Sequence, residues 1–105
     1  MSWPVIHIIL HIIVPGIASY LLFHKRWKCA WLIMAATMLV DLDHLLAVPV
    51  YDPGRCSIGF HPLHTWPAIG AYLAMVAFPL LRPLSSGLII HMTLDWLYCL
   101  NLAWA

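Results

Sequence analysis

Long apolar runs, separated by short polar turns, dominate the chain from end to end. Each run approaches the roughly 20 residues that a helix needs to cross a bilayer. The pattern predicts an all-α, integral membrane bundle of four transmembrane helices, in a single domain over residues 1–105. The expected spans cover residues 3–23, 29–48, 66–81 and 84–104.

Positive charges gather on one side of this four-span arrangement. Lys25, Arg26 and Lys28 follow the first span, and Arg82 precedes the fourth, whereas only Arg55 falls on the other side. The positive-inside rule assigns the richer side to the cytoplasm. We therefore expect the N- and C-termini on the outer side.

The composition is that of a membrane protein and differs from that of soluble domains and of nucleic-acid-binding proteins. Hydrophobic residues make up 64% of the chain and charged residues 9%, against about 25% charged in soluble domains. A net charge of +1 without a basic stripe excludes a nucleic-acid partner. Membrane lipids are the expected surroundings, and a chain this small leaves a homo-oligomer open as a way to enclose a cavity.

The three cysteines form no CxxC pair and resemble neither a zinc knuckle nor a disulfide framework. Cys56 and Cys99 both fall on the expected outer side, where a bridge between them is conceivable. The pattern nevertheless favours three isolated cysteines that serve as small apolar residues.

Ionisable residues inside the apolar runs carry the functional signal. An Asp at the centre of a membrane helix costs roughly 2.5–3.5 kcal/mol on insertion scales, so something must compensate it. Four segments each contribute a pair at a spacing that lets two side chains converge: His7 and His11, Asp41 and His44, His61 and His64, and His91 and Asp95. At about 1.5 Å per residue, the pairs within spans lie in the outer half or near the midplane. They predict one polar cavity that opens outward.

Asp43 does not fit this pattern, because in a regular helix it points about 200° from Asp41. Three interpretations stay open: the helix loosens here, the two carboxylates serve two ions, or Asp43 orients a ligand histidine.

Imidazole and carboxylate groups together suit a divalent transition metal, with zinc preferred and manganese or iron as alternatives. The predicted ligands are His7, His11, Asp41, His44, His61, His91 and Asp95. This set exceeds the four ligands of one tetrahedral zinc, so one or two ions are expected. Asp43, as general base or ligand-orienting residue, and His64, as acid or completing ligand, are the predicted catalytic residues.

Two motifs resemble a known family. Asp41-Leu42-Asp43-His44 and His91-Met92-Thr93-Leu94-Asp95 are similar to the DxDH and HxxxD motifs of the YdjM-like family of bacterial inner-membrane metal-dependent hydrolases, of which the chain looks like a compact branch. The resemblance implies a multi-pass protein of the bacterial inner membrane. It also implies metal-binding roles for Asp41, Asp43, His44, His91 and Asp95. The chain departs from the family at residues 61–65. The family has an arginine beside the corresponding histidine, whereas this stretch has none. Arg55 is the residue that could take the place of that arginine.

These features predict a membrane-embedded metal-dependent hydrolase that acts on a lipid-like or phosphoester substrate near the outer leaflet. One alternative is an ion or proton carrier or channel, although the inner halves hold nothing more polar than Thr37, Ser85 and Ser86. A bis-histidine haem protein leaves three intramembrane aspartates unexplained. A non-catalytic membrane subunit stapled by metal agrees equally well with the sequence.

Overall fold

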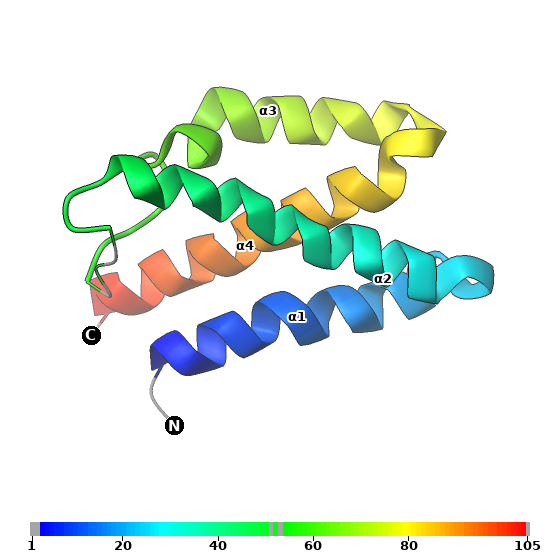
Figure 1. The fold of residues 1–105 in the computed structure, drawn as a ribbon, viewed down its shortest axis with the longest axis horizontal. Helices are drawn as coiled ribbons and strands as arrows, with labels where there is room; N and C mark the ends of the chain where they lie inside the picture. Colours follow the sequence, from blue (N-terminus) through cyan, green and yellow to red (C-terminus); the bar gives the residue numbers. More distant parts are fainter. Residues whose placement is uncertain (1–2, 51, 53, 105) are drawn as a thin grey trace.

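The computed structural model describes residues 3–50, 52 and 54–104, which form a bundle of four helices without a strand in the described part (Figure 1). The α-helices are α1 (Trp3–Leu22), α2 (Trp27–Ala36), α3 (Trp66–Ala74) and α4 (Arg82–Trp104). Five 3₁₀ segments complete them: η1 (His24–Arg26), η2 (Thr37–Leu46), η3 (Pro62–His64), η4 (Met75–Ala77) and η5 (Pro79–Leu81). The predicted all-α class with four helices is confirmed.

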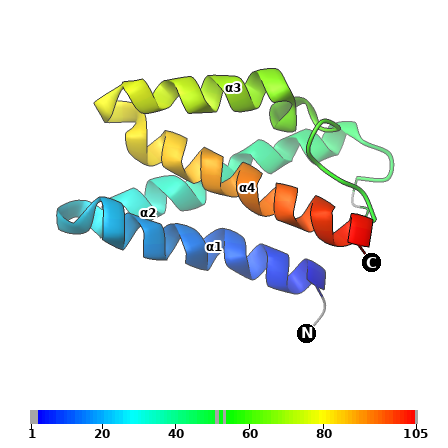
Figure 2. The same cartoon turned by 180° about the vertical axis from the view of Figure 1, so that it is seen from behind.

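The four helices form a layered bundle with two distinct ends. α1 packs against α2, α4 packs against both, and α3 packs on α4 away from α1 (Figures 1 and 2). α1 begins and α4 ends at the same end, where the connection from η2 to η3 also lies. We call this the loop end. The turns that carry η1 and η5 lie at the opposite end, which we call the basic end because it holds Lys25, Arg26 and Arg82.

The distribution of polarity is inverted relative to a soluble protein. Large apolar side chains are exposed on every helix, among them Ile17, Leu21, Leu32, Leu73 and Leu97. The buried side chains include an unusual share of polar ones: His11, Ser19, Thr37, Asp43, His61, His64, Ser85, His91 and Asp95. A soluble bundle buries its apolar side chains instead, and large exposed apolar surfaces mark contact with a partner or a membrane.

Two helical segments of the described chain, Pro4–Leu22 and His24–Leu46, are long and apolar enough to cross a membrane. Their mean hydropathies are 2.1 and 1.5. Trp66–Ala77, which joins α3 and η4, is apolar but shorter. α4 has 23 residues, yet it carries His91 and Asp95 in its interior.

α2 changes to 3₁₀ winding at Thr37 and continues as η2 to Leu46. With 3.0 residues per turn, residues three apart eclipse each other, so Asp41 and His44 share one face while Asp43 points to another. The helix therefore tightens in this region, in contrast to the loosening considered from the sequence. The two neighbouring carboxylates thus leave the helix on different sides and contact opposite nitrogens of the His64 ring, Asp41 at Nε2 and Asp43 at Nδ1.

Glycines allow two close helix contacts. A Cβ at Gly87 of α4 would lie 2.8 Å from the Cα of Met34 and 2.8 Å from the Cγ2 of Thr37. A Cβ at Gly16 of α1 would lie 2.8 Å from the ring of Trp31, whose Nε1 donates to the Ile12 carbonyl oxygen (2.9 Å). α2 therefore sits tightly against α4 and α1, which holds η2 above the centre of α4.

Cys56 and Cys99 form a disulfide, and only Cys29 is a free cysteine. The prediction of three isolated cysteines was wrong for this pair. Because 43 residues separate the two cysteines, only the return of α4 to the loop end brings them together. The bond ties the loop before η3 to the helix that carries His91 and Asp95.

Replacement of Gly87 by alanine tests the contact between α2 and α4. The added methyl group meets main-chain atoms of Met34, which cannot rotate away, so we expect a loss of stability of about 1–3 kcal/mol. Gly70→Ala in α3 is the matched control, since no atom lies within 4 Å of its Cβ position; it should be neutral or stabilise by up to about 1 kcal/mol. Thermal unfolding in detergent compares the two. Equal stabilities would contradict the close packing.

Candidate metal centre

Four side chains from three elements converge in the middle of the bundle. We call them the core cluster: Asp41 from η2, His64 from η3, and His91 and Asp95 from α4. The side chains of His64, His91 and Asp95 are buried, whereas that of Asp41 is 34% exposed. The i, i+4 spacing of His91 and Asp95 places both on one face of α4.

The core cluster has the dimensions of a tetrahedral metal site. His64 Nε2 lies 3.2 Å from Asp41 Oδ1, 3.0 Å from Asp95 Oδ2 and 3.3 Å from His91 Nε2. His91 Nε2 lies 3.1 Å from Asp41 Oδ1 and 3.3 Å from Asp95 Oδ2. Four ligands at zinc's usual bond lengths stand about 3.3 Å apart at the corners of a tetrahedron. Five of the six donor–donor distances are thus close to those around one tetrahedral ion, and all four donors lie within 4.8 Å of one another.

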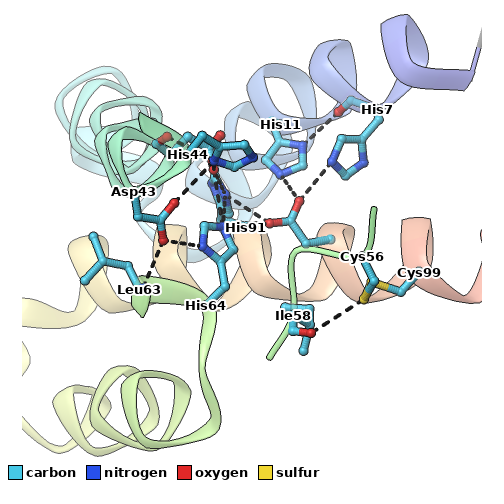
Figure 3. Close-up of polar contacts among 12 residues, drawn as sticks. His7, His11, Asp43, His44, Cys56, Ile58, Leu63, His64, His91 and Cys99 are labelled. Carbon is cyan, nitrogen blue, oxygen red and sulfur yellow. Dashed lines mark hydrogen bonds and ion pairs between the residues drawn. A yellow bond between two sulfur atoms is a disulfide. The ribbon is translucent and has the colours of Figure 1, made fainter. Parts of the chain in front are cut away.

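Asp43 orients His64 from outside the core cluster. Its Oδ2 accepts hydrogen bonds from His64 Nδ1 (2.9 Å) and from the Leu63 main-chain N–H (2.9 Å), and its Oδ1 accepts one from His44 Nδ1 (3.3 Å). With the proton of the neutral ring on Nδ1, the lone pair of Nε2 points at the core cluster (Figure 3). A carboxylate that fixes a ligand histidine in this way is a common feature of metal sites.

The carboxylates of the core cluster and of Asp43 favour a positive charge at His64. Burial alone would lower the pKa of the His64 imidazole on the connection before α3, but hydrogen bonds to Asp41, Asp95 and Asp43 outweigh burial and raise the pKa to about 10. Without a metal ion, a proton on His64 therefore offsets the carboxylates at neutral pH. A metal ion must displace this proton, so metal binding strengthens as the pH rises through the neutral range.

A second group shares Asp95 with the first. His7 Nε2 lies 2.9 Å and His11 Nε2 3.0 Å from Asp95 Oδ1, while Asp95 Oδ2 faces the core cluster. We call His7, His11 and Asp95 the α1 cluster, because both histidines project from α1 toward α4 (Figure 3). One carboxylate thus joins two groups of donor atoms.

A third group, formed by Asp43, His44 and His61, suits a metal less well. Both oxygens of Asp43 already accept hydrogen bonds, as described above. The rings of His44 and His61 stack with their centroids 3.8 Å apart. His61 is 1% exposed, and its Nε2 has no hydrogen-bond partner within the described residues.

A pocket of about 270 Å³ lies beside these clusters at the loop end. Its polar wall includes His7, Asp41, His44, His61 and Asp95, and Pro4, Ile8 and Met38 form an apolar wall. Arg55 also lines it, held in place by a hydrogen bond from Nη1 to the Pro49 carbonyl oxygen (2.9 Å) and by the ring of Phe60, 4.7 Å below the guanidinium. The pocket thus combines carboxylates, imidazoles and one fixed cation.

The structure places all the predicted site residues near one another and divides them among separate clusters. His7, His11, Asp41, His91 and Asp95 fall in the two clusters that share Asp95. His64, predicted as an acid or completing ligand, stands among the ligand atoms, whereas His44 and His61 flank them. The roles of these residues stay predictions.

Tyr98 was missed from the sequence. It lines the pocket, and its ring centroid lies 4.7 Å from that of His7. Its position three residues after Asp95 and seven after His91 places it on the same face of α4, a spacing that the sequence already contained.

Residues 1–102 match the family of unknown function DUF6122, and the chain belongs to that family. No curated protein and no solved structure matches the chain. The match does not support the YdjM-like relationship expected from the motifs. The family carries no assigned activity, so the function has to be argued from the geometry of the clusters and the pocket.

Asp43→Asn tests the orienting role of Asp43. The amide can still approach the His64 ring, but it lacks the charge that fixes the Nδ1–H tautomer, so we expect metal affinity to fall about 10–100-fold. Asp52→Asn is the control, because Asp52 caps an exposed turn by accepting from Gly54 N–H. Competition with a chromophoric chelator measures the affinity. An unchanged affinity in Asp43→Asn would show that His64 needs no orientation from this carboxylate.

Proposed function

We propose that the chain is a membrane-embedded, metal-dependent hydrolase that acts on a lipid-like phosphoester near the outer leaflet. The observation that carries the proposal is the convergence of donor atoms at 3.0–3.3 Å beside a pocket that holds a fixed arginine. The resemblance of the DxDH and HxxxD motifs to those of YdjM-like hydrolases supports the same reading.

All four helices span the membrane in this proposal, with the loop end facing outward. The exposed apolar side chains face lipid, and the buried histidines and carboxylates are compensated inside the bundle. The basic end then faces the cytoplasm, in agreement with the positive-inside rule. The disulfide supports the same orientation, because such bonds persist on the oxidising side of a membrane. The bacterial inner membrane is the location we infer.

Zinc is the metal we propose, with manganese or iron as alternatives, because the donors are imidazoles and carboxylates without thiolate. Such an ion lowers the pKa of water and polarises a phosphoryl oxygen. The chain supplies the remaining functions around it. Arg55 binds the anionic group of the substrate, as guanidinium suits phosphate oxygens. His44 and His61 lie on the pocket wall, where an imidazole can transfer a proton to a leaving group.

The two walls of the pocket favour an amphiphilic substrate. Pro4, Ile8 and Met38 from α1 and η2 contribute apolar lining, and Arg55 and Ser57 on the loop contribute polar lining. A lipid tail fits the apolar part of such a lining and a phosphate-containing headgroup the polar part. This arrangement agrees with a substrate that enters from the outer leaflet.

The alternative function, a carrier or channel that relays protons or ions across the membrane, has less support than the hydrolase. Ser19, Thr37 and Ser85 are the buried polar side chains nearer the basic end, and each donates its hydroxyl to a carbonyl oxygen three residues earlier in its own helix. In the described part of the chain, these bonds leave no titratable path from Asp95 to the basic end. The metal centre therefore faces one side of the membrane only.

Cysteine labelling tests the orientation. In a Cys29→Ser background, Lys25→Cys lies at the basic end and Ser57→Cys, beside the pocket, at the loop end. A membrane-impermeant maleimide should label Ser57→Cys in intact spheroplasts and Lys25→Cys only after permeabilisation. The disulfide keeps Cys56 and Cys99 from reacting. The reverse pattern would overturn the proposed orientation.

Metal analysis and activity assays on the purified protein test the proposed hydrolase function. We expect tightly bound zinc, manganese or iron by elemental analysis, and release of phosphate or a phosphorylated headgroup from lipids in mixed micelles. Asp41→Ala and His91→Ala should each lose metal and reduce turnover by at least 100-fold, because each removes a donor of the core cluster. His24→Ala, at the basic end, should keep both. Absence of metal from the wild type would end the proposal, and metal without turnover on any lipid would favour the metal-stapled subunit.

A further inference from the structure

The core cluster is a closed site. Its four protein donors fill the four positions of a tetrahedral ion, the arrangement of structural zinc sites, whereas catalytic sites use three protein ligands and leave one position open. Of these donors, only Asp41 and Asp95 line the pocket, while His64 and His91 lie behind them. An ion held there is poorly placed to bind a substrate.

The α1 cluster has the complementary composition. Two histidines and one carboxylate are the ligands of several catalytic zinc sites, and His7 and Asp95 both line the pocket. A fourth position at this cluster therefore opens toward the space where a substrate would lie. The cluster also stands on two different helices, so an ion there would join α1 to α4.

The hydrogen bonds of His11 point to a cation at the α1 cluster. His11 is 3% exposed, and its Nδ1 donates to the His7 carbonyl oxygen (2.8 Å). In the neutral ring, the lone pair is then on Nε2, which lies 3.0 Å from Asp95 Oδ1. Apart from this contact with Asp95, the buried Nε2 has no hydrogen-bond partner in the described chain. In this tautomer a lone pair faces a carboxylate oxygen, an arrangement that a shared cation stabilises.

We propose that His7, His11 and Asp95 bind a second metal ion, and that this ion, with its open position toward the pocket, is the one that contacts the substrate. Asp95 bridges the two ions, with Oδ1 on the second and Oδ2 on the core ion. The core ion then holds η2, η3 and α4 together. The catalytic assignment rests on the proposed hydrolase function, whereas the second ion itself does not depend on it.

His11→Asn tests the second ion with little disturbance. The asparagine amide replaces the Nδ1–H donor to the His7 carbonyl oxygen and removes only the Nε2 donor. Elemental analysis of zinc-loaded, full-length protein should give two ions per wild-type chain and one per His11→Asn chain. His24→Asn at the basic end is the control and should keep two. One ion in the wild type, or two in His11→Asn, would overturn the second site.

Cobalt-loaded protein tests the open position without relying on turnover. Inorganic phosphate should shift the visible cobalt spectrum of the wild type but leave that of His11→Asn, which retains only the closed core ion, unchanged. A phosphate response that survives in His11→Asn would place the open position at the core cluster and overturn the assignment. If the hydrolase holds, turnover should also fall at least 100-fold in His11→Asn. Loss of one ion and of the phosphate response, in a protein without turnover, would keep the second site and reject only the hydrolase.

Discussion

The compensation of Asp95 is the constraint on which the rest of the structure depends. This carboxylate is 5% exposed on a helix surrounded by apolar side chains, and a buried, unpaired charge costs several kcal/mol. Four histidine nitrogens stand within 3.3 Å of its two oxygens, drawn from α1, η3 and α4 itself. α1 and η3 therefore bring histidines that offset the charge, whereas η2 brings the second carboxylate of the core cluster, Asp41. The bundle is organised around a polar centre where a soluble bundle would have an apolar core.

That centre requires close and specific helix contacts. Gly87 lets η2 approach α4 closely enough for Asp41 to reach His91 Nε2. The 3₁₀ winding of η2 then turns Asp43 away toward His64 and Leu63. Two residues of one short motif thus have different tasks, one among the donor atoms and one behind them.

The sequence predicted the helices and most of the donor residues, because apolar runs and helical spacing are local signals. It did not predict how the donors divide between two clusters, since that depends on which oxygen of Asp95 faces which helix. The role of His64 also depended on tertiary structure, because Asp43 fixes its ring from a position 21 residues away. The disulfide between Cys56 and Cys99 was missed for the same reason. It depends on the path of the loop, for which three scattered cysteines give no signal.

The disulfide and the core cluster both order the connection between η2 and α3. The connection between η2 and α3 carries His61, His64 and Arg55, yet only short 3₁₀ and turn segments order it. A loop of this kind loses much conformational entropy when it is fixed in place. The Cys56–Cys99 bond fixes the middle of this connection to α4, and the contacts of His64 with Asp43, Asp41 and Asp95 fix its end. Arg55 directly precedes the first anchor, His61 lies between the two anchors, and both residues line the pocket. The loop is thereby ordered by the same helix that carries His91 and Asp95, so the positions of the proposed anion site at Arg55 and of the candidate metal centre are set together.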